Sequence, residues 1–143
     1  MPDILHDLII QKDPGRVFEA VSQPELLEKW WTHRSLGQPI LGGIYELDFG
    51  PGYQWEGVVV RFVPAGVFEL KITNADPDWT GTLVGFELTA EGPGARLRFH
   101  HCGWREANEH FRVTSNCWGL YLRLLRRFLE TGETIPYSQR QTA

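Results

Sequence analysis

The sequence predicts an α+β fold in which a strongly twisted six-stranded antiparallel sheet wraps around a long C-terminal helix. Between residues 41 and 101, glycine and proline recur about every ten positions with apolar–polar alternation between them, a pattern typical of an antiparallel meander. Between about Asn108 and Glu130, apolar residues recur at helical spacing instead. A one-sided sheet must bury its apolar face, and this helix is the element long enough to cover it.

The first strand and two short helices are expected ahead of the meander. Asp3–Ile10 is mostly apolar, which suits a strand covered mainly on one face. Asp13 can then cap a helix whose first position is Pro14. Pro24 cannot continue that helix but can start another, so two short helices should lie between strands 1 and 2.

The remaining five strands are indicated by alternation alone. Each has one apolar and one solvated face, as expected for an antiparallel sheet with a single covered side. Their inward residues are Tyr45, Leu47 and Phe49; Trp55, Gly57 and Val59; Phe68, Leu70 and Ile72; Val84, Phe86 and Leu88; and Leu97, Phe99 and His101.

The C-terminal helix is the strongest helical pattern in the chain. Gly132 supplies its stop signal, and a helix of this length would span roughly 34 Å, enough to cross the domain. The final segment, "IPYSQRQTA", is expected to fray from about residue 134. We expect residues 1–143 to form a single domain.

Composition excludes several classes of protein. Fourteen basic and eighteen acidic residues give a formal net charge of −4, which argues against a nucleic-acid partner. No apolar run approaches the ~18 residues of a membrane span, and no basic leader precedes the N-terminal apolar residues. Cys102 and Cys117 form no CxxC pair. We therefore expect a protein of the cytoplasm, a reducing compartment in which disulfides are rare.

The tryptophan doublet "WW" suggests aromatic cover at an opening. Six tryptophans are more than a small core needs, and tryptophan favours pockets and interfaces. Neighbouring helical residues point about 100° apart, so Trp30 is expected to face inward and Trp31 to turn toward a rim. Two interpretations remain open: both rings seal the gap between the short helices and the sheet, or Trp31 forms part of a ligand entrance with Trp55, Trp104 and Tyr121.

Several segments together resemble a known family. They are "VFEAVSQPELLEKWW", "LGGIYELDF", "WEGVVVRFVP", "GARLRFHHCGW" and "CWGLYLRLLRRFLETGE". In order and spacing the chain is similar, from Ile4 to Glu133, to the activator-of-heat-shock-protein-90-ATPase homologues. These belong to the START-like (SRPBCC) superfamily of helix-grip folds.

The resemblance implies a cavity between sheet and C-terminal helix, often lined by aromatic residues. Trp30 and Trp31 match the family's paired tryptophans, His101 its histidine near the end of the last strand, and Trp118 its tryptophan facing the sheet. The superfamily includes carriers, cyclases and co-chaperone domains, and the family name implies a stress-response setting.

We expect neither a metal nor a cofactor. His100 and His101 are adjacent on a strand and therefore point to opposite faces. Glu46 and Asp48 alternate on the solvated side of their strand, and no nucleophile motif or phosphate-binding loop is present. His101 faces the interior, where it is a hydrogen-bonded core histidine, a group that orients a ligand, or an acid or base.

The leading functional hypothesis is binding of a small, largely apolar molecule, aromatic or lipid-like, between the sheet and the C-terminal helix, with weak catalysis or none. Three alternatives remain open: a chaperone-interaction module of the heat-shock protein 90 ATPase activator type, an enzyme of the polyketide cyclase or aromatase kind, and a solidly packed core. No oligomeric state is indicated. The candidate ligand-binding residues are Trp30, Trp31, Trp55, Phe86, Phe99, His101, Trp118 and Tyr121.

Overall fold

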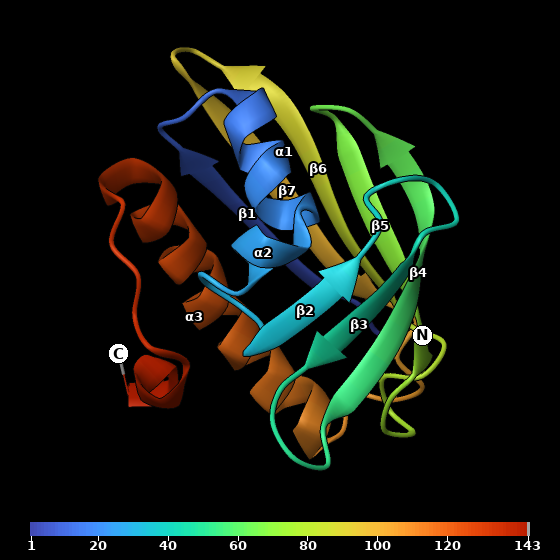
Figure 1. Ribbon diagram of the computed structural model, residues 1–143. Helices are drawn as coiled ribbons and strands as arrows, with labels where there is room; N and C mark the ends of the chain where they lie inside the picture. Colours follow the sequence, from blue (N-terminus) through green and yellow to red (C-terminus); the bar gives the residue numbers. More distant parts are fainter. Residues whose placement is uncertain (143) are drawn as a thin grey trace.

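The computed structural model describes residues 1–142 and confirms the predicted α+β fold class (Figure 1). Its antiparallel sheet has the strand order β1-β7-β6-β5-β4-β3-β2. The strands are β1 (Ile4–Ile10), β2 (Arg34–Gly37), β3 (Ile44–Asp48), β4 (Gln54–Val63), β5 (Val67–Asn74), β6 (Leu83–Glu91) and β7 (Gly94–Cys102). The helices are α1 (Pro14–Ser22), α2 (Pro24–Leu27), α3 (Glu109–Thr131) and the 3₁₀ helix η1 (Tyr137–Thr142).

The predicted strand number is wrong by one, because the sheet has seven strands and β2 was not foreseen. This four-residue strand pairs with β3 at the sheet edge, from Arg34 opposite Asp48 to Gly37 opposite Tyr45. It is too short to show alternation in the sequence. The backbone N–H of Ser35 donates to the Glu28 carboxylate at 2.9 Å, so a side chain satisfies part of this edge.

The two short helices form as predicted, but the second ends before the tryptophan doublet. The side chain of Asp13 caps α1 by accepting from the Arg16 N–H at 3.1 Å. The carbonyl of Leu27 accepts from the N–H groups of both Trp31 and Thr32, at 2.8 and 3.1 Å, and the chain leaves the helix there. Trp30 and Trp31 therefore lie in a turn, which frees both rings from helical spacing.

The long helix α3 lies on the same face of the sheet as α1 and α2 (Figure 1). The Asn108 side chain caps it by accepting from the Phe111 N–H at 2.9 Å, and Gly132, with φ of 77°, ends it in the left-handed conformation. Nε2 of His6 on β1 lies 3.1 Å from the Ser115 carbonyl, which ties the helix to the sheet. Among residues 1–142, no helix is long and apolar enough to cross a membrane.

The C-terminal segment does not fray from residue 134 as predicted. Arg140 is 3% exposed, and its guanidinium donates to the carbonyls of Ile135 at 3.0 Å and Thr32 at 3.1 Å, and also to that of Glu28. The carbonyls of Glu28 and Thr32 lie at and after the end of α2, where they have no helical donor. One buried arginine therefore fixes η1 against the rest of the fold.

Candidate functional site

A cavity of about 320 Å³ opens beside the first turns of α3. The β3–β4 turn and the β5–β6 loop gather at the same end of the molecule (Figure 1). We call it the aromatic cavity, because eight of its twelve lining residues are aromatic. The lining residues are Trp31, Phe49, Tyr53, Trp55, Trp79, His110, Val113, Thr114, Cys117, Trp118, Tyr121 and Tyr137.

One face of α3 supplies half of this wall. His110, Thr114, Cys117 and Tyr121 are separated by four, three and four residues, the spacing that brings helical side chains onto one face. Burial raises the pKa of the Cys117 thiol. Burial likewise raises the pKa of Tyr121 to about 12, so the Cys117 and Tyr121 side chains are uncharged near neutral pH.

Five of the aromatic side chains contact one another in a closed circuit. Trp31 lies 5.0 Å from Trp118 and 5.5 Å from Phe49, measured between ring centroids. Phe49 is 5.4 Å from Trp55, which is 4.8 Å from Trp79. The circuit closes between Trp79 and Trp118, whose ring centroids are 6.3 Å apart and whose planes are nearly parallel, at 22° to each other. The circuit holds each ring by its neighbours, which makes the wall rigid.

Behind this wall, His101 is 0% exposed and both of its ring nitrogens are bonded to protein. The indole N–H of Trp118 donates to Nδ1 at 3.1 Å, so Nδ1 must be the acceptor and Nε2 carries the proton. Nε2 then donates to Thr82 Oγ1 at 2.8 Å, and this hydroxyl donates to the Trp79 carbonyl at 2.6 Å. Burial, with the charges of His100 and His110, lowers the pKa of His101 to about 3.

The eight residues singled out from the sequence divide into two groups of four. Trp31, Trp55, Trp118 and Tyr121 line the aromatic cavity. The other four are buried behind it and do not line it: Trp30, Phe86, Phe99 and His101. The indole of Trp30 donates instead to the Ala20 carbonyl at 2.9 Å, and its ring packs edge-on against Phe86 at 6.0 Å.

Two expectations about the rim are wrong. Trp31 is 2% exposed rather than turned toward solvent, because it is enclosed by Trp118 and Phe49. Trp104 does not line the cavity and is 1% exposed, since it packs behind the wall against His101, 4.9 Å away between ring centroids. Trp30 is therefore part of the packed interior, and Trp31 is a buried wall of the cavity that frames no entrance.

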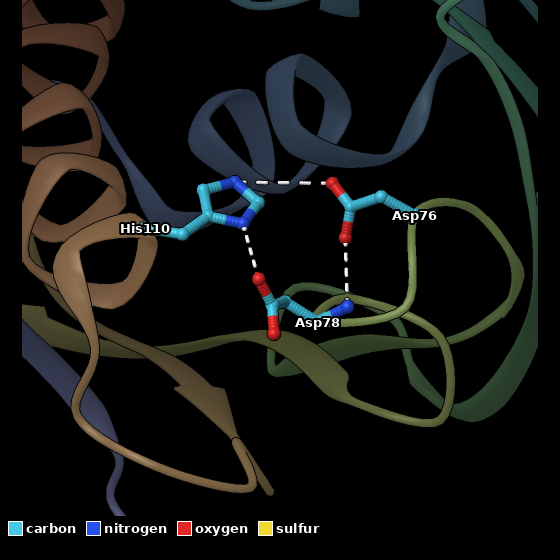
Figure 2. Close-up of side chains that lie close together, drawn as sticks. All are labelled: Asp76, Asp78 and His110. Carbon is cyan, nitrogen blue, oxygen red and sulfur yellow. Dashed lines mark hydrogen bonds and ion pairs between the residues drawn. The ribbon is translucent and has the colours of Figure 1, made fainter.

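An acidic group of side chains, not foreseen from the sequence, adjoins the cavity at His110 (Figure 2). Nδ1 of His110 lies 2.9 Å from Oδ2 of Asp78, and Nε2 lies 3.8 Å from Oδ2 of Asp76. Because an ionised carboxylate can only accept, Nδ1 is the donor to Asp78. Oδ1 of Asp76 accepts the backbone N–H groups of Asp78 and Trp79, both at 2.9 Å, and so positions the Trp79 ring.

These three side chains offer one ring nitrogen and two carboxylate oxygens within 4.8 Å of one another, donor types that divalent metal ions accept. The two carboxylates face opposite nitrogens of the His110 ring (Figure 2). A metal ion could therefore take only one of these nitrogens, and the carboxylate at the other nitrogen would orient the ring.

The C-terminal segment completes the cavity. The Tyr137 hydroxyl donates to the Phe49 carbonyl at 3.0 Å, which fixes its ring as one wall. The Gln141 amide donates to the Tyr121 hydroxyl at 2.6 Å. The sequence patterns did not single out Tyr137 because it follows the last regular helix, nor Trp79 because it lies in the polar turn "NADPDW". A large apolar residue within such a turn is the only signal that pointed to it.

A second, larger groove of about 870 Å³ lies along β2, β3 and β4. Glu46 and Glu56 face each other across β3 and β4 in this groove. Both are exposed, as the predicted solvated face requires. Because nine of its twelve lining residues are polar or charged, the groove is a poor match for an apolar molecule, and we assign the candidate site to the aromatic cavity.

The architecture and the cavity together define a helix-grip protein, in which a curved antiparallel sheet holds a long helix and leaves an aromatic-lined space at one end. A family model described as "Activator of Hsp90 ATPase homolog 1-like protein" matches residues 12–130, and the chain belongs to this family. A search of curated protein sequences found no match.

Solved structures share the architecture over nearly the whole chain. The Aha1 dimer from Colwellia psychrerythraea is 25% identical, with a TM-score of 0.85, covering 93% of this chain and 99% of that one. A Mesorhizobium loti protein is 20% identical, with a TM-score of 0.81 and coverage of 92% and 99%. DynU16, from the dynemicin biosynthetic locus, is 22% identical, with a TM-score of 0.77 and coverage of 94% and 50%.

Proposed function

We propose that this protein binds one small, flat, largely apolar molecule in the aromatic cavity. The observation that carries the proposal is a cavity of about 320 Å³ in which eight of the twelve lining residues are aromatic. This volume lies at the lower end of the range for small-molecule sites. At the packing density of protein interiors, about 0.75, it accommodates about 240 Å³ of ligand atoms. Such a volume has room for two or three fused rings.

Affinity would come mainly from apolar burial, at about 25 cal/mol per Å², and from stacking on the indole rings. We propose that Trp31, Trp55, Trp118 and Tyr121 contact the ligand. Trp30, Phe86, Phe99 and His101 would act from behind by holding those rings in place. This division follows the cavity lining and the hydrogen bond from Trp118 to His101.

The similarity to DynU16, from a biosynthetic locus, supports a small-molecule role for the architecture. A cyclase or aromatase activity has less support, because the histidine considered as its acid or base, His101, has both nitrogens bonded to protein. The free thiols of Cys102 and Cys117 are compatible with the proposed cytoplasmic setting.

The second candidate is interaction with a chaperone of the heat-shock protein 90 type, as part of a stress response. The family description favours it, and one solved relative is a dimer. A group of exposed apolar side chains on and near the β2–β3 edge offers a surface for a protein partner. They are Leu36, Ile40, Leu41 and Ile44.

Isothermal titration calorimetry with 1-naphthylmethanol, a neutral two-ring probe, tests the proposal. We expect one site, with a negative heat-capacity change from apolar burial. The variant Cys117→Phe should abolish binding by filling the cavity from α3. Its matched control is Asn116→Phe, which places the same ring at the exposed neighbouring position and should bind like the original chain.

Equal binding by the two variants would exclude this cavity as the binding site. No binding by the unmodified chain to this probe or to related two- and three-ring compounds, together with capture of purified heat-shock protein 90, would favour the chaperone-interaction module instead.

A further inference from the structure

The mouth of the aromatic cavity at His110 carries a net negative charge. Asp76 and Asp78 lie at the two nitrogens of the His110 ring (Figure 2). Their summed charge is −2 when the imidazole is neutral and −1 when it is protonated. Among the described residues that line the cavity there is no lysine or arginine to offset this charge. An anionic ligand would be repelled at this end, and a cationic one attracted.

Asp76 has an oxygen without a hydrogen-bond donor among residues 1–142. Its Oδ1 accepts two backbone N–H groups, whereas Oδ2 lies 3.8 Å from Nε2 of His110, a separation too long for a hydrogen bond. In the neutral ring whose Nδ1 donates to Asp78, Nε2 is an acceptor. A single donor atom placed between Oδ2 and Nε2 can reach both. Two separate hydrogen bonds to these acceptors require two hydrogens on the donor atom, which an ammonium has and a hydroxyl lacks.

The walls next to this gap also favour a cation. Indole faces attract ammonium groups through their negative π-surface, an effect of about 0.5–2 kcal/mol. Trp79 follows Asp78 directly in the chain, and its ring lies 4.8 Å from that of Trp55. Both rings line the cavity, so aromatic faces and carboxylates adjoin one another, as in sites that bind amines.

We infer that the ligand is an organic amine, with an apolar or aromatic frame that lies among the tryptophans and a protonated nitrogen that lies at Asp76, Asp78 and His110. This inference rests on the proposed function, because it specifies the class of molecule that the same cavity takes.

Three probes with the same ring system test it: 1-naphthylmethylamine, 1-naphthylmethanol and 1-naphthoate, which are a cation, a neutral molecule and an anion. Their dissociation constants are measured by calorimetry at low salt, with and without EDTA. We expect the amine to bind about tenfold more tightly than the alcohol, and the carboxylate to bind most weakly. The amine's advantage should shrink as salt is added.

The variant Asp76→Asn should reduce amine binding to within about twofold of the same variant's alcohol binding. Asn keeps an Oδ1 acceptor for the backbone N–H groups of Asp78 and Trp79, so the loop should persist. Asp78→Asn should act in the same direction. The control Glu56→Gln removes an exposed carboxylate on β4, away from the cavity lining, and should leave all three constants unchanged.

Equal binding of amine and alcohol by the original chain would overturn the inference and leave the proposed function standing. An amine advantage that persists in both aspartate variants would also overturn it. An advantage that disappears with EDTA would place a metal ion at the three side chains and reject the ammonium assignment. Failure of all three probes to bind would count against the proposed function itself.

Discussion

The indole N–H of Trp118 donates to Nδ1 of His101 at 3.1 Å, which joins the middle of α3 to the end of β7. The same indole ring is part of the cavity wall. Nε2 of His101 donates to the hydroxyl of Thr82. That hydroxyl in turn donates to the carbonyl of Trp79, another residue of the cavity wall. One buried imidazole therefore positions two tryptophans of the cavity wall, Trp118 on α3 and Trp79 in the β5–β6 loop.

The first prediction concerns the pH dependence of stability. His101 has a pKa of about 3 when folded, against 6.5 for an ordinary histidine, so between these values the unfolded chain binds more protons. Stability from His101 is complete above pH 6.5 and falls by about 1.4 kcal/mol per pH unit below it. Urea unfolding at pH 7 and pH 5 should show this loss, about 2 kcal/mol.

The variant His101→Gln isolates this effect, because glutamine can accept from Trp118 and donate to Thr82 but does not titrate. The extra loss of stability at pH 5 should be absent from the variant. Equal pH dependence of the two proteins would show that His101 becomes protonated in the native state.

The second prediction concerns Gly85 on β6. A Cβ atom there would lie 2.2 Å from the His100 ring and 3.1 Å from the Glu69 carboxylate. These two side chains form a 2.5 Å hydrogen bond on the outer face of the sheet. Glu69 is 6% exposed, so breaking its pair leaves a buried charge. We expect Gly85→Ala to lower the free energy of unfolding by about 3 kcal/mol, measured by chemical denaturation.

The third prediction is that Gly119→Ala has the opposite sign. Gly119 lies inside α3, where a Cβ atom would approach His6 and Arg123 only at 3.7 and 3.8 Å. Because alanine is the better helix former, we expect an increase in the free energy of unfolding of about 0.5–1 kcal/mol. A decrease in the same denaturation assay would mean that the helix needs this glycine for close packing.

The fourth prediction concerns Arg140. Its three hydrogen bonds to backbone carbonyls are charge-assisted, so Arg140→Ala should lower the free energy of unfolding by about 2 kcal/mol. Amide exchange of residues 137–142 should become much faster. Arg140→Lys should restore little, because an ammonium lacks the planar fork that reaches three carbonyls. Unchanged exchange in Arg140→Ala would show that other contacts hold the segment.

The fifth prediction concerns the two thiols. Burial, with the Asp3 carboxylate and other acidic groups, raises the pKa of Cys102 to about 11, and burial raises that of Cys117. Iodoacetamide should therefore alkylate both slowly at pH 7.5. Because only Cys117 lines the cavity, 1-naphthylmethanol should slow its alkylation further and leave Cys102 unaffected, as followed by mass spectrometry. Equal protection of both would indicate a global change.

Alternation and helical spacing were sufficient to predict most of the fold. The strands of the meander and α3 are long enough to show their periods, and Leu97, Phe99 and His101 are buried on the face assigned to them. The four-residue strand β2 has no measurable period. The order of the C-terminal segment was not predicted because it depends on Arg140. Arginine is usually exposed, and a sequence does not indicate that its side chain will bond carbonyls more than 100 positions away.

The cavity was harder to predict, because its walls come from turns as well as regular elements. Alternation assigns Trp55 to an inner face, and Trp118 follows from the period of α3. Trp79, Tyr53 and Tyr137 lie outside any regular pattern. Periodicity also cannot separate residues that line a space from those packed behind it, which is why Phe86 and Phe99 were grouped with Trp31.

The sheet order has a consequence for biosynthesis. β1 pairs with β7, so that Ile4 lies opposite His101, and within residues 1–142 β1 pairs with no other strand of the sheet. During synthesis β1 therefore has no strand to pair with until β7, roughly a hundred residues later in the chain, has left the ribosome. Until then its apolar side chains are exposed. Such distant pairing slows folding, so we expect this short stretch to be where a nascent chain most needs shielding.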